Sequence, residues 1–351
     1  MSINRRQIFT AVAAASLAAR FPLAASAEPD VCVRTFPLPQ TASPELQKLI
    51  LERKGNVGWK ISPKTGDEWR DIVKASTAEI EARDASWPAK YGVTIREDRM
   101  GGVPVFWVTP MKLPAANRKR LLLNFHGGAY VYAPGKSGLE DAILMAGRCG
   151  FRVLSVDYRM APDFPYPAAI DDAEAVWREL IKTTKPKHIG IFGTSTGGGM
   201  TLALIHRLKK KALPLPSALW AGTPWSDLGK VGDSCFTNEF VDTGLVSYDG
   251  ALASAAQFYA GGHDLREPEI SPVYGDFSGF PPTHLTTGTR DLFLSATVRV
   301  HRKLRDAGVV TDLTVIEALS HADYVALPES PESHQVYGDA KAFFLRTLKA
   351  K

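Results

Sequence analysis

Ser195 lies at the tip of a short stretch of small residues that runs from Gly193 to Gly197. An apolar segment, residues 188–192, precedes the stretch, and a segment with helical spacing follows it as far as Lys211. This order predicts a strand, a tight turn and a helix. A serine hydroxyl is a weak nucleophile in water, and a sharp turn makes it useful by presenting it to a neighbouring base. The pattern is therefore typical of a nucleophilic serine.

A base and an orienting acid for that serine both occur later in the chain. Asp291 follows a predicted strand at 284–287, and His321 follows another at 313–316. Because ligand-binding residues of open α/β sheets collect beyond the carboxyl ends of the strands, we expect these side chains to meet at one edge. The sequence predicts that His321 takes the proton of Ser195 and that Asp291 orients the imidazole.

Other histidines and aspartates are the alternatives to these two. Of the eight histidines, only His126 and His321 follow predicted strands in places suited to a site, and we expect His206 and His301 to be exposed or satisfied by packing. Asp306 and Asp312 stay open as alternatives for the acid. Asp306 falls in a predicted helix and Asp312 at the start of a strand, so Asp291 is preferred.

A glycine pair follows the strongly apolar segment 121–125, in the order His126, Gly127, Gly128. Two adjacent glycines let the backbone N–H groups point into a pocket, where they can stabilise the negative oxygen of a tetrahedral intermediate. The backbone N–H of Thr196, directly after Ser195, is the third donor that we expect. A plain glycine turn is the alternative interpretation of the pair.

From residue 91 onward the chain alternates between short apolar segments and segments with helical spacing, whereas residues 44–89 have helical spacing only. This alternation predicts an α/β fold with a mostly parallel central sheet flanked by helices on both faces. The expected strands are 93–96, 103–108, 121–125, 153–156, 189–192, 218–220, 284–287 and 313–316, and the expected helices are 168–181, 196–211, 295–307 and 331–348.

One region interrupts the alternation. Residues 227–271 are rich in glycine and aromatic residues and contain no clear strand, so we expect an inserted helical segment. Together with residues 28–89 it is predicted to form a helical lid on a single domain that spans residues 28–351.

The motifs around these residues resemble those of a known family. Residues 126–130 match a His-Gly-Gly oxyanion motif and residues 193–198 resemble a nucleophile elbow. Residues 157–169 are similar to a long signature segment that lies between the two motifs, and the likeness covers roughly residues 60–348. On these residues the chain resembles the hormone-sensitive-lipase-like family of α/β-hydrolases, a group of bacterial carboxylesterases, lipases and lactone hydrolases.

The resemblance implies an α/β-hydrolase fold and a serine hydrolase that cleaves carboxylic esters through a Ser-His-Asp triad and an acyl-enzyme. Its expected substrates are small-molecule esters with short to medium acyl chains, aryl esters or lactones, and no cofactor or metal is implied. Within the same fold an amidase or peptidase stays open, as does a non-catalytic ligand-binding relative.

The chain departs from the family pattern at three places. Thr196 stands where alanine is usual and adds a hydroxyl near the oxyanion site, while Ala129 replaces a frequent third glycine. The residues after Asp291 lack the acidic side chains that many relatives carry. Gly127 and Gly128 are therefore the expected donors of the loop rather than residue 129.

The first 27 residues have the features of a twin-arginine export signal. Arg5 and Arg6 precede a weakly apolar, alanine-rich stretch that Arg20 ends, and a small-residue cleavage site follows at 25–27. The stretch is too short to span a bilayer, so we expect a periplasmic or secreted bacterial protein without stable membrane insertion. Loss of the leader lowers the formal charge from +5 to +2.

The remaining composition points to no further partner. A short basic run at 209–211 ends a predicted helix, where cations interact well with the helix dipole, so nucleic acid is not an expected partner. The protein is expected to be a monomer or a homodimer. We expect Asp157 and Arg159 to pair and brace the loop beside the oxyanion strand. Of the three cysteines, Cys32 and Cys235 are candidates for a disulfide, and Cys149 for a buried free thiol.

Overall fold

The computed structural model describes residues 36–53 and 60–348. Its centre is one eight-stranded sheet in the order β1-β2-β4-β3-β5-β6-β7-β8. The strands are β1 Val93–Met100, β2 Val103–Pro110, β3 Leu121–Phe125, β4 Arg152–Val156, β5 Ile189–Thr194, β6 Ala218–Gly222, β7 Thr283–Gly288 and β8 Thr311–Ile316. The pairs β1–β2 and β2–β4 are antiparallel and all other neighbouring pairs are parallel. The expected mostly parallel sheet is confirmed.

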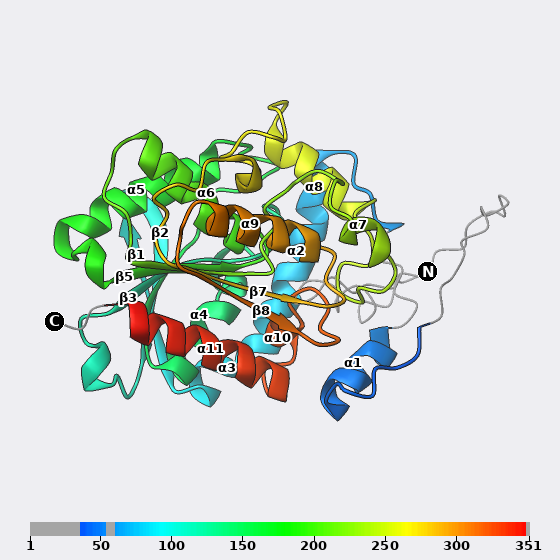
Figure 1. Cartoon of the computed structure of the whole chain (residues 1–351), viewed down its shortest axis with the longest axis horizontal. Coiled ribbons are helices and arrows are strands. Elements are labelled where there is room, and N and C mark those ends of the chain that lie inside the picture. Colours follow the sequence, from blue (N-terminus) through cyan, green and yellow to red (C-terminus); the bar gives the residue numbers. More distant parts are fainter. Residues whose placement is uncertain (1–35, 54–59, 349–351) are drawn as a thin grey trace, which may run out of the picture.

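Helices cover the sheet on both sides (Figure 1). They are α1 Pro44–Arg53, α2 Gly66–Asp84, α3 Trp87–Lys90, α4 Glu140–Cys149, α5 Ala168–Thr183, α6 Thr196–Lys210, α7 Ser234–Thr237, α8 Ala251–Ala260, α9 Leu294–Asp306, α10 Asp323–Ala326 and α11 Pro331–Thr347. Helices α5, α6 and α9 pack on one face, and α4 and α11 on the other. Helix α4 is an element that the sequence analysis did not assign.

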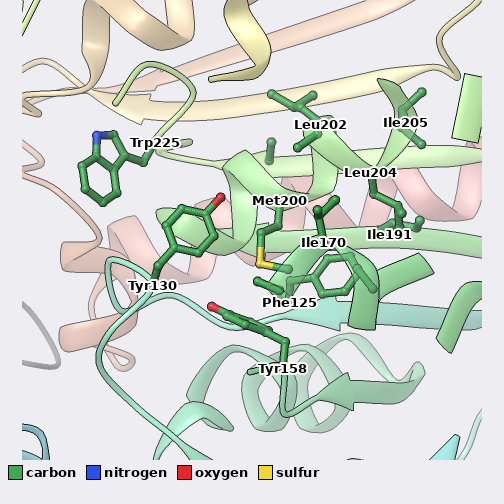
Figure 2. Close-up of a cluster of buried hydrophobic side chains, with 14 of the residues drawn as sticks. Phe125, Tyr130, Tyr158, Ile170, Ile191, Met200, Leu202, Leu204, Ile205 and Trp225 are labelled. Atoms are coloured by element: carbon green, nitrogen blue, oxygen red, sulfur yellow. The ribbon is translucent and has the colours of Figure 1, made fainter. Parts of the chain in front are cut away.

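The central strands are buried on both faces because helices cover both. Every residue of β3, β5, β6 and β7 is buried. One core cluster lies between the sheet and α5, α6 and α9, and Figure 2 shows part of it, with Met200 and Leu204 of α6 near Ile191 of β5. The second cluster lies on the α4 and α11 face. The two cores hold the carboxyl ends of the parallel strands at one edge, and the site residues follow those ends.

The two segments expected to form a lid contact each other. Trp69 of α2 donates from Nε1 to Ser254 Oγ of α8 at 3.1 Å, and the Ser254 hydroxyl in turn donates to the Pro63 carbonyl at 2.5 Å. The Trp69 ring also packs edge-on against Tyr132, with ring centroids 5.3 Å apart. Tyr132 lies in the loop after β3, so the N-terminal helices and the 227–271 insertion both lie close to the predicted oxyanion loop.

The predictions about the cysteines, membrane insertion and the export signal can now be compared with the structure. Cys149 is a buried free thiol, as expected. Cys235 is also a buried free thiol and donates to the Leu292 carbonyl at 3.7 Å, while Cys32, its expected partner, lies outside the described residues. Among the described residues, no helix is both long and apolar enough to span a bilayer. The predicted export signal at 1–27 also lies outside the described residues.

Candidate active site

Ser195 sits in the one-residue turn between β5 and α6, with φ 60° and ψ −119°. A positive φ is uncommon for a residue with a side chain and marks a strained turn. The Ser195 N–H donates to the Gly222 carbonyl of β6 at 2.8 Å, and its carbonyl accepts from Gly199 and Trp225. The expected strand, turn and helix are confirmed, and the side chain is partly exposed at the end of the strand.

Small residues around Ser195 are required because the backbone is packed closely there. A Cβ on Gly197 would lie 1.8 Å from the Phe125 carbonyl oxygen, and a Cβ on Gly193 would lie 2.3 Å from the same atom. Strand β3 and the first turn of α6 therefore touch through their backbones. Only glycine permits this approach, which explains why the sequence around the serine is so poor in side chains.

The predicted oxyanion loop lies directly beside this turn. A Cβ built on Gly127 would be 3.5 Å from the Cβ of Ser195 and 3.1 Å from the Thr194 carbonyl oxygen. Gly128 has φ 119°, and the following Ala129 and Tyr130 have φ 53° and 62°. Among the described residues, no acceptor is recorded for the N–H groups of Gly127, Gly128 and Thr196. For Thr196 this agrees with its place in the first turn of α6, whose N–H groups have no partner within the helix.

The loop is braced from the segment after β4. Tyr158 donates from its hydroxyl to the His126 carbonyl at 2.8 Å, and the two rings stack with centroids 4.3 Å apart. His126 Nδ1 lies 2.7 Å from the Gly127 carbonyl oxygen. Burial lowers the pKa of the His126 imidazole, so the ring is neutral at neutral pH. His126 thus shapes the glycine loop.

The expected pair between Asp157 and Arg159 is wrong. Asp157 Oδ1 accepts from the Gly135 N–H at 2.9 Å, which ties it to the loop after β3. Arg159 instead pairs with Asp172 of α5, with Nη2 2.7 Å from Oδ1. The two side chains diverge because the chain after β4 passes between the glycine loop on one side and α5 on the other.

Asp291 and His321 meet, as the order of the chain predicted. His321 Nδ1 lies 3.0 Å from Asp291 Oδ1, and both side chains are buried. The Asp291 carboxylate also accepts from the Phe293 N–H at 2.9 Å and the Thr287 hydroxyl at 2.7 Å. These bonds fix the carboxylate, which in turn fixes the tautomer and the direction of the ring.

The other ring nitrogen of His321 is Nε2, which is buried and has no hydrogen-bond partner among the described residues. No hydrogen bond therefore joins it to Ser195 Oγ in this structure. In unliganded enzymes such bonds are often long and tighten when substrate binds.

Two contacts bring the His321 loop against the Ser195 turn. Tyr324 OH lies 2.8 Å from Thr194 Oγ1, so a residue of α10 touches the residue before Ser195. The ring of Phe293 stacks on Trp225 at 5.7 Å and meets the His321 ring edge-on at 4.8 Å. The backbone N–H of Trp225 also donates to the Ser195 carbonyl. A continuous set of contacts therefore joins Ser195 to His321 through the rings of Trp225 and Phe293.

The charge around His321 was not evident from the sequence. Burial alone would lower the pKa of the imidazole, but the adjacent Asp291 carboxylate and the charges of Asp242 and Asp323 together outweigh burial, so the pKa is raised. Asp323 is buried and accepts from Arg53 Nη1 of α1 at 2.6 Å. No local motif marks Asp242, Asp323 or Arg53 as belonging to a site.

The alternative acids lie elsewhere. Asp312 at the start of β8 pairs with Arg346 of α11, and Asp306 at the end of α9 pairs with Arg302. Neither is recorded in contact with His321. Among the described residues, no group of three or more His, Cys, Asp or Glu side chains is arranged to hold a metal ion.

Comparisons with known proteins agree with this architecture. The family model described as the alpha/beta hydrolase fold matches residues 122–325. An acetyl-hydrolase from Streptomyces hygroscopicus is 31% identical over 235 residues, which cover 67% of this chain and 78% of the relative. An esterase from Acinetobacter venetianus is 29% identical over 260 residues, or 73% and 84% of the two chains.

Solved structures are similar as well. The crystal structure of an esterase superposes with a TM-score of 0.87 at 40% identity and covers 90% of this chain and 98% of that one. An esterase from the bacterial hormone-sensitive lipase family gives a TM-score of 0.74 at 28% identity, with 88% and 99% covered. The chain therefore belongs to the α/β-hydrolase family, in its hormone-sensitive-lipase-like group of esterases.

Proposed function

We propose that this carboxylic ester hydrolase works through Ser195, His321 and Asp291. His321 Nε2 accepts the proton of the Ser195 hydroxyl while Oγ attacks the carbonyl carbon of the ester, which forms a tetrahedral intermediate. The intermediate collapses, the alcohol leaves with the proton from His321, and the acyl group stays on Ser195. Water then attacks the acyl-enzyme by the same route and releases the acid.

One observation carries this proposal. Asp291 occupies one nitrogen of His321 at 3.0 Å, and the other nitrogen is buried without a partner among the residues that the structure describes. A buried polar atom without a partner is costly and calls for an explanation, and a proton acceptor waiting for substrate supplies one. The strained turn at Ser195, joined to the same loop through Thr194 and Tyr324, supports the serine as the proton donor.

The N–H groups of Gly127, Gly128 and Thr196 are proposed to hold the negative oxygen of the intermediate. Within residues 36–53 and 60–348 these three groups have no acceptor, which supports this role, as does the contact distance from Gly127 to Ser195. Donors fixed in advance stabilise the transition state without reorganising during the reaction.

The substrates are proposed to be short to medium acyl esters, aryl esters or lactones. A relative named as an acetyl-hydrolase supports the short end of this range. The contacts from Trp69 to Ser254 and Tyr132 support a lid built from the N-terminal helices and the 227–271 insertion. Such a lid would limit the length of the acyl chain.

A series of p-nitrophenyl esters from acetate to decanoate tests the reaction and the substrate range together. We expect the highest kcat/KM at acetate to hexanoate and a burst of nitrophenol equal to the enzyme concentration, because an acyl-enzyme accumulates. A p-nitroanilide with the same acyl group separates an esterase from an amidase. Faster cleavage of the anilide, or no turnover of any ester, would overturn the proposal.

Export through residues 1–27 is a separate proposal, supported by Arg5, Arg6 and the small residues at 25–27. Replacement of both arginines with lysine in the full chain is expected to keep the protein in the cytoplasm of a bacterial host, whereas the parent reaches the periplasm or medium. Equal distribution of the two chains would argue against a twin-arginine signal.

A further inference from the structure

Asp242 is a fully buried carboxylate in the loop between α7 and α8. Its Oδ1 accepts from the backbone N–H groups of Gly244 at 2.8 Å, Leu245 at 3.0 Å and His321 at 3.4 Å. Its Oδ2 accepts from the Leu292 N–H at 2.9 Å. In the part of the chain that the structure describes, all of these partners are main-chain donors, so the carboxylate binds backbone from three separate segments.

Two of those segments carry the residues of the proposed triad. Leu292 directly follows Asp291, and the third donor to Oδ1 is the N–H of His321 itself. One side chain of the insertion therefore links the loop after β7 to the loop after β8. Residues next to Asp242 strengthen the link, because the Thr243 N–H donates to Ser320 Oγ at 3.1 Å.

We propose that Asp242 is a positioning residue that holds Asp291 and His321 in register, and that its negative charge stabilises the imidazolium formed when His321 takes a proton. This inference rests on the proposed function of the same site. Asp242 does not touch the reacting atoms, so it acts through the two loops and through its electric field.

The charged groups around His321 decide how large the field effect is. They are three buried carboxylates and two nearby guanidiniums: Asp291, Asp242, Asp323, Arg53 and Arg290. Arg53 pairs with Asp323 and Arg290 lies near both Asp323 and Asp242, so part of the negative charge is compensated. Burial, followed by the charge of Asp291, raises the pKa of Asp242 to about 6, and Asp242 is therefore ionised at pH 8.

Asp242→Asn keeps the shape and removes the charge. The amide oxygen can still accept from Gly244 and Leu245, but the amide nitrogen then faces the Leu292 N–H, donor against donor. We expect kcat on p-nitrophenyl butyrate at pH 8 to fall about tenfold because the Asp291 loop is no longer held. The acid limb of kcat/KM should move about one unit to lower pH, because His321 loses a neighbouring negative charge.

Asp242→Glu separates the positioning of the two loops from the effect of the negative charge on His321. It keeps the charge but displaces the carboxylate by one methylene, so we expect a lower kcat with an acid limb close to that of the parent. The matched control is Asp227→Asn, a buried aspartate of the same insertion whose carboxylate accepts from Arg299 at 2.6 Å, Tyr274 at 2.9 Å and the Gly229 backbone N–H at 3.0 Å. Asp227→Asn removes contacts of the insertion away from His321, so we expect the acid limb of kcat/KM to stay at the pH that it has in the parent.

The outcomes are read together with Ser195→Ala. If Ser195→Ala is inactive while Asp242→Asn keeps both the parent kcat and the parent acid limb, this inference is overturned and the proposed function stands. If Ser195→Ala keeps the parent rate, the proposed function fails. If Asp242→Asn does not fold, as judged by circular dichroism, Asp242→Glu decides, and a kcat equal to that of the parent would contradict the positioning role.

Discussion

The turn that carries Ser195 and the two loops that carry Asp291 and His321 are held by different kinds of contact. The turn is held by backbone packed on backbone, with no room for a methyl group at Gly193 or Gly197. The loops are held by buried polar side chains from distant parts of the chain, such as Arg53, which lies 270 residues from its partner Asp323.

Because of this difference, we expect the turn and the loops to respond differently to pH and to substitution. Close backbone packing fixes the position of the serine and carries no net charge, so we expect pH to leave it unchanged. The loops owe their position to carboxylates, and the same carboxylates set the proton affinity of His321. Damage to the turn should therefore abolish the reaction outright, whereas damage to the loops should change its rate and its pH dependence.

The largest effect is expected from Ser195→Ala. Loss of the nucleophile should lower kcat on p-nitrophenyl butyrate by about 10⁴-fold or more, since only the oxyanion donors and substrate binding remain. The loss in kcat is measured from initial rates with purified protein. A circular dichroism spectrum equal to that of the parent shows that the variant is folded. Activity within tenfold of that of the parent would show that Ser195 is not the nucleophile.

Asp291→Asn tests the loop side of the comparison. We expect kcat to fall about 10³-fold, because an amide no longer selects the imidazole tautomer that accepts a proton from serine. Asp312→Asn is the control, since Asp312 pairs with Arg346 and was the alternative acid. A greater loss of kcat in Asp312→Asn than in Asp291→Asn would identify Asp312, and not Asp291, as the acid of the triad.

Gly197→Ala probes the packing of the turn. The added Cβ would meet the Phe125 carbonyl oxygen at 1.8 Å, so strand β3 and helix α6 must separate. We expect the free energy of unfolding to drop by about 3 kcal/mol, measured by urea denaturation. Gly338→Ala is the contrasting change, because a Cβ there meets nothing within 4 Å, and that exposed helical site should gain about 1 kcal/mol.

Arg53→Ala probes the corresponding support of the loops. It leaves the buried Asp323 carboxylate without its guanidinium partner, and we expect a loss of about 3 kcal/mol in the free energy of unfolding. Lys48→Ala in the same helix removes only an exposed pair with Glu52 and should leave the unfolding midpoint unchanged. Equal midpoints for the two variants would mean that the buried pair adds nothing.

The smallest expected effect concerns the pH profile of the parent. His321 must be neutral to accept a proton, and its neighbouring carboxylates raise its pKa, so activity is present above that pKa and lost as the pH falls through it. The acid limb of kcat/KM should therefore have its midpoint above the ordinary histidine value of 6.5. A midpoint below 6.5 would show that burial outweighs the carboxylates.

The two regions also differ in how far the sequence alone predicted them. The strand Leu121–Phe125, the turn at Ser195 and the glycine loop were predicted at their positions, because local apolar runs and local glycines encode them. The meeting of Asp291 and His321 followed from the rule that residues beyond parallel strands share an edge. Each of these features is encoded by residues that lie close together in the sequence.

The contacts that support the loops were not predicted because they join residues far apart in the chain. Asp242 lies in a glycine-rich insertion without a motif, and its partners are backbone groups that any residue supplies. The predicted pair of Arg159 with Asp157 was wrong for a related reason: the place of the segment beside the oxyanion strand suggested it, whereas Arg159 binds Asp172 of α5 in the fold. Such pairings depend on the tertiary structure.

The central claim is that Ser195 is the nucleophile activated by His321. The most direct measurement is mass spectrometry of the full chain after reaction with a fluorophosphonate, followed by peptide mapping. The account predicts one adduct per chain, located on Ser195, and a large loss of labelling rate in His321→Ala. An adduct on another residue, or labelling of Ser195 at the parent rate without His321, would contradict it.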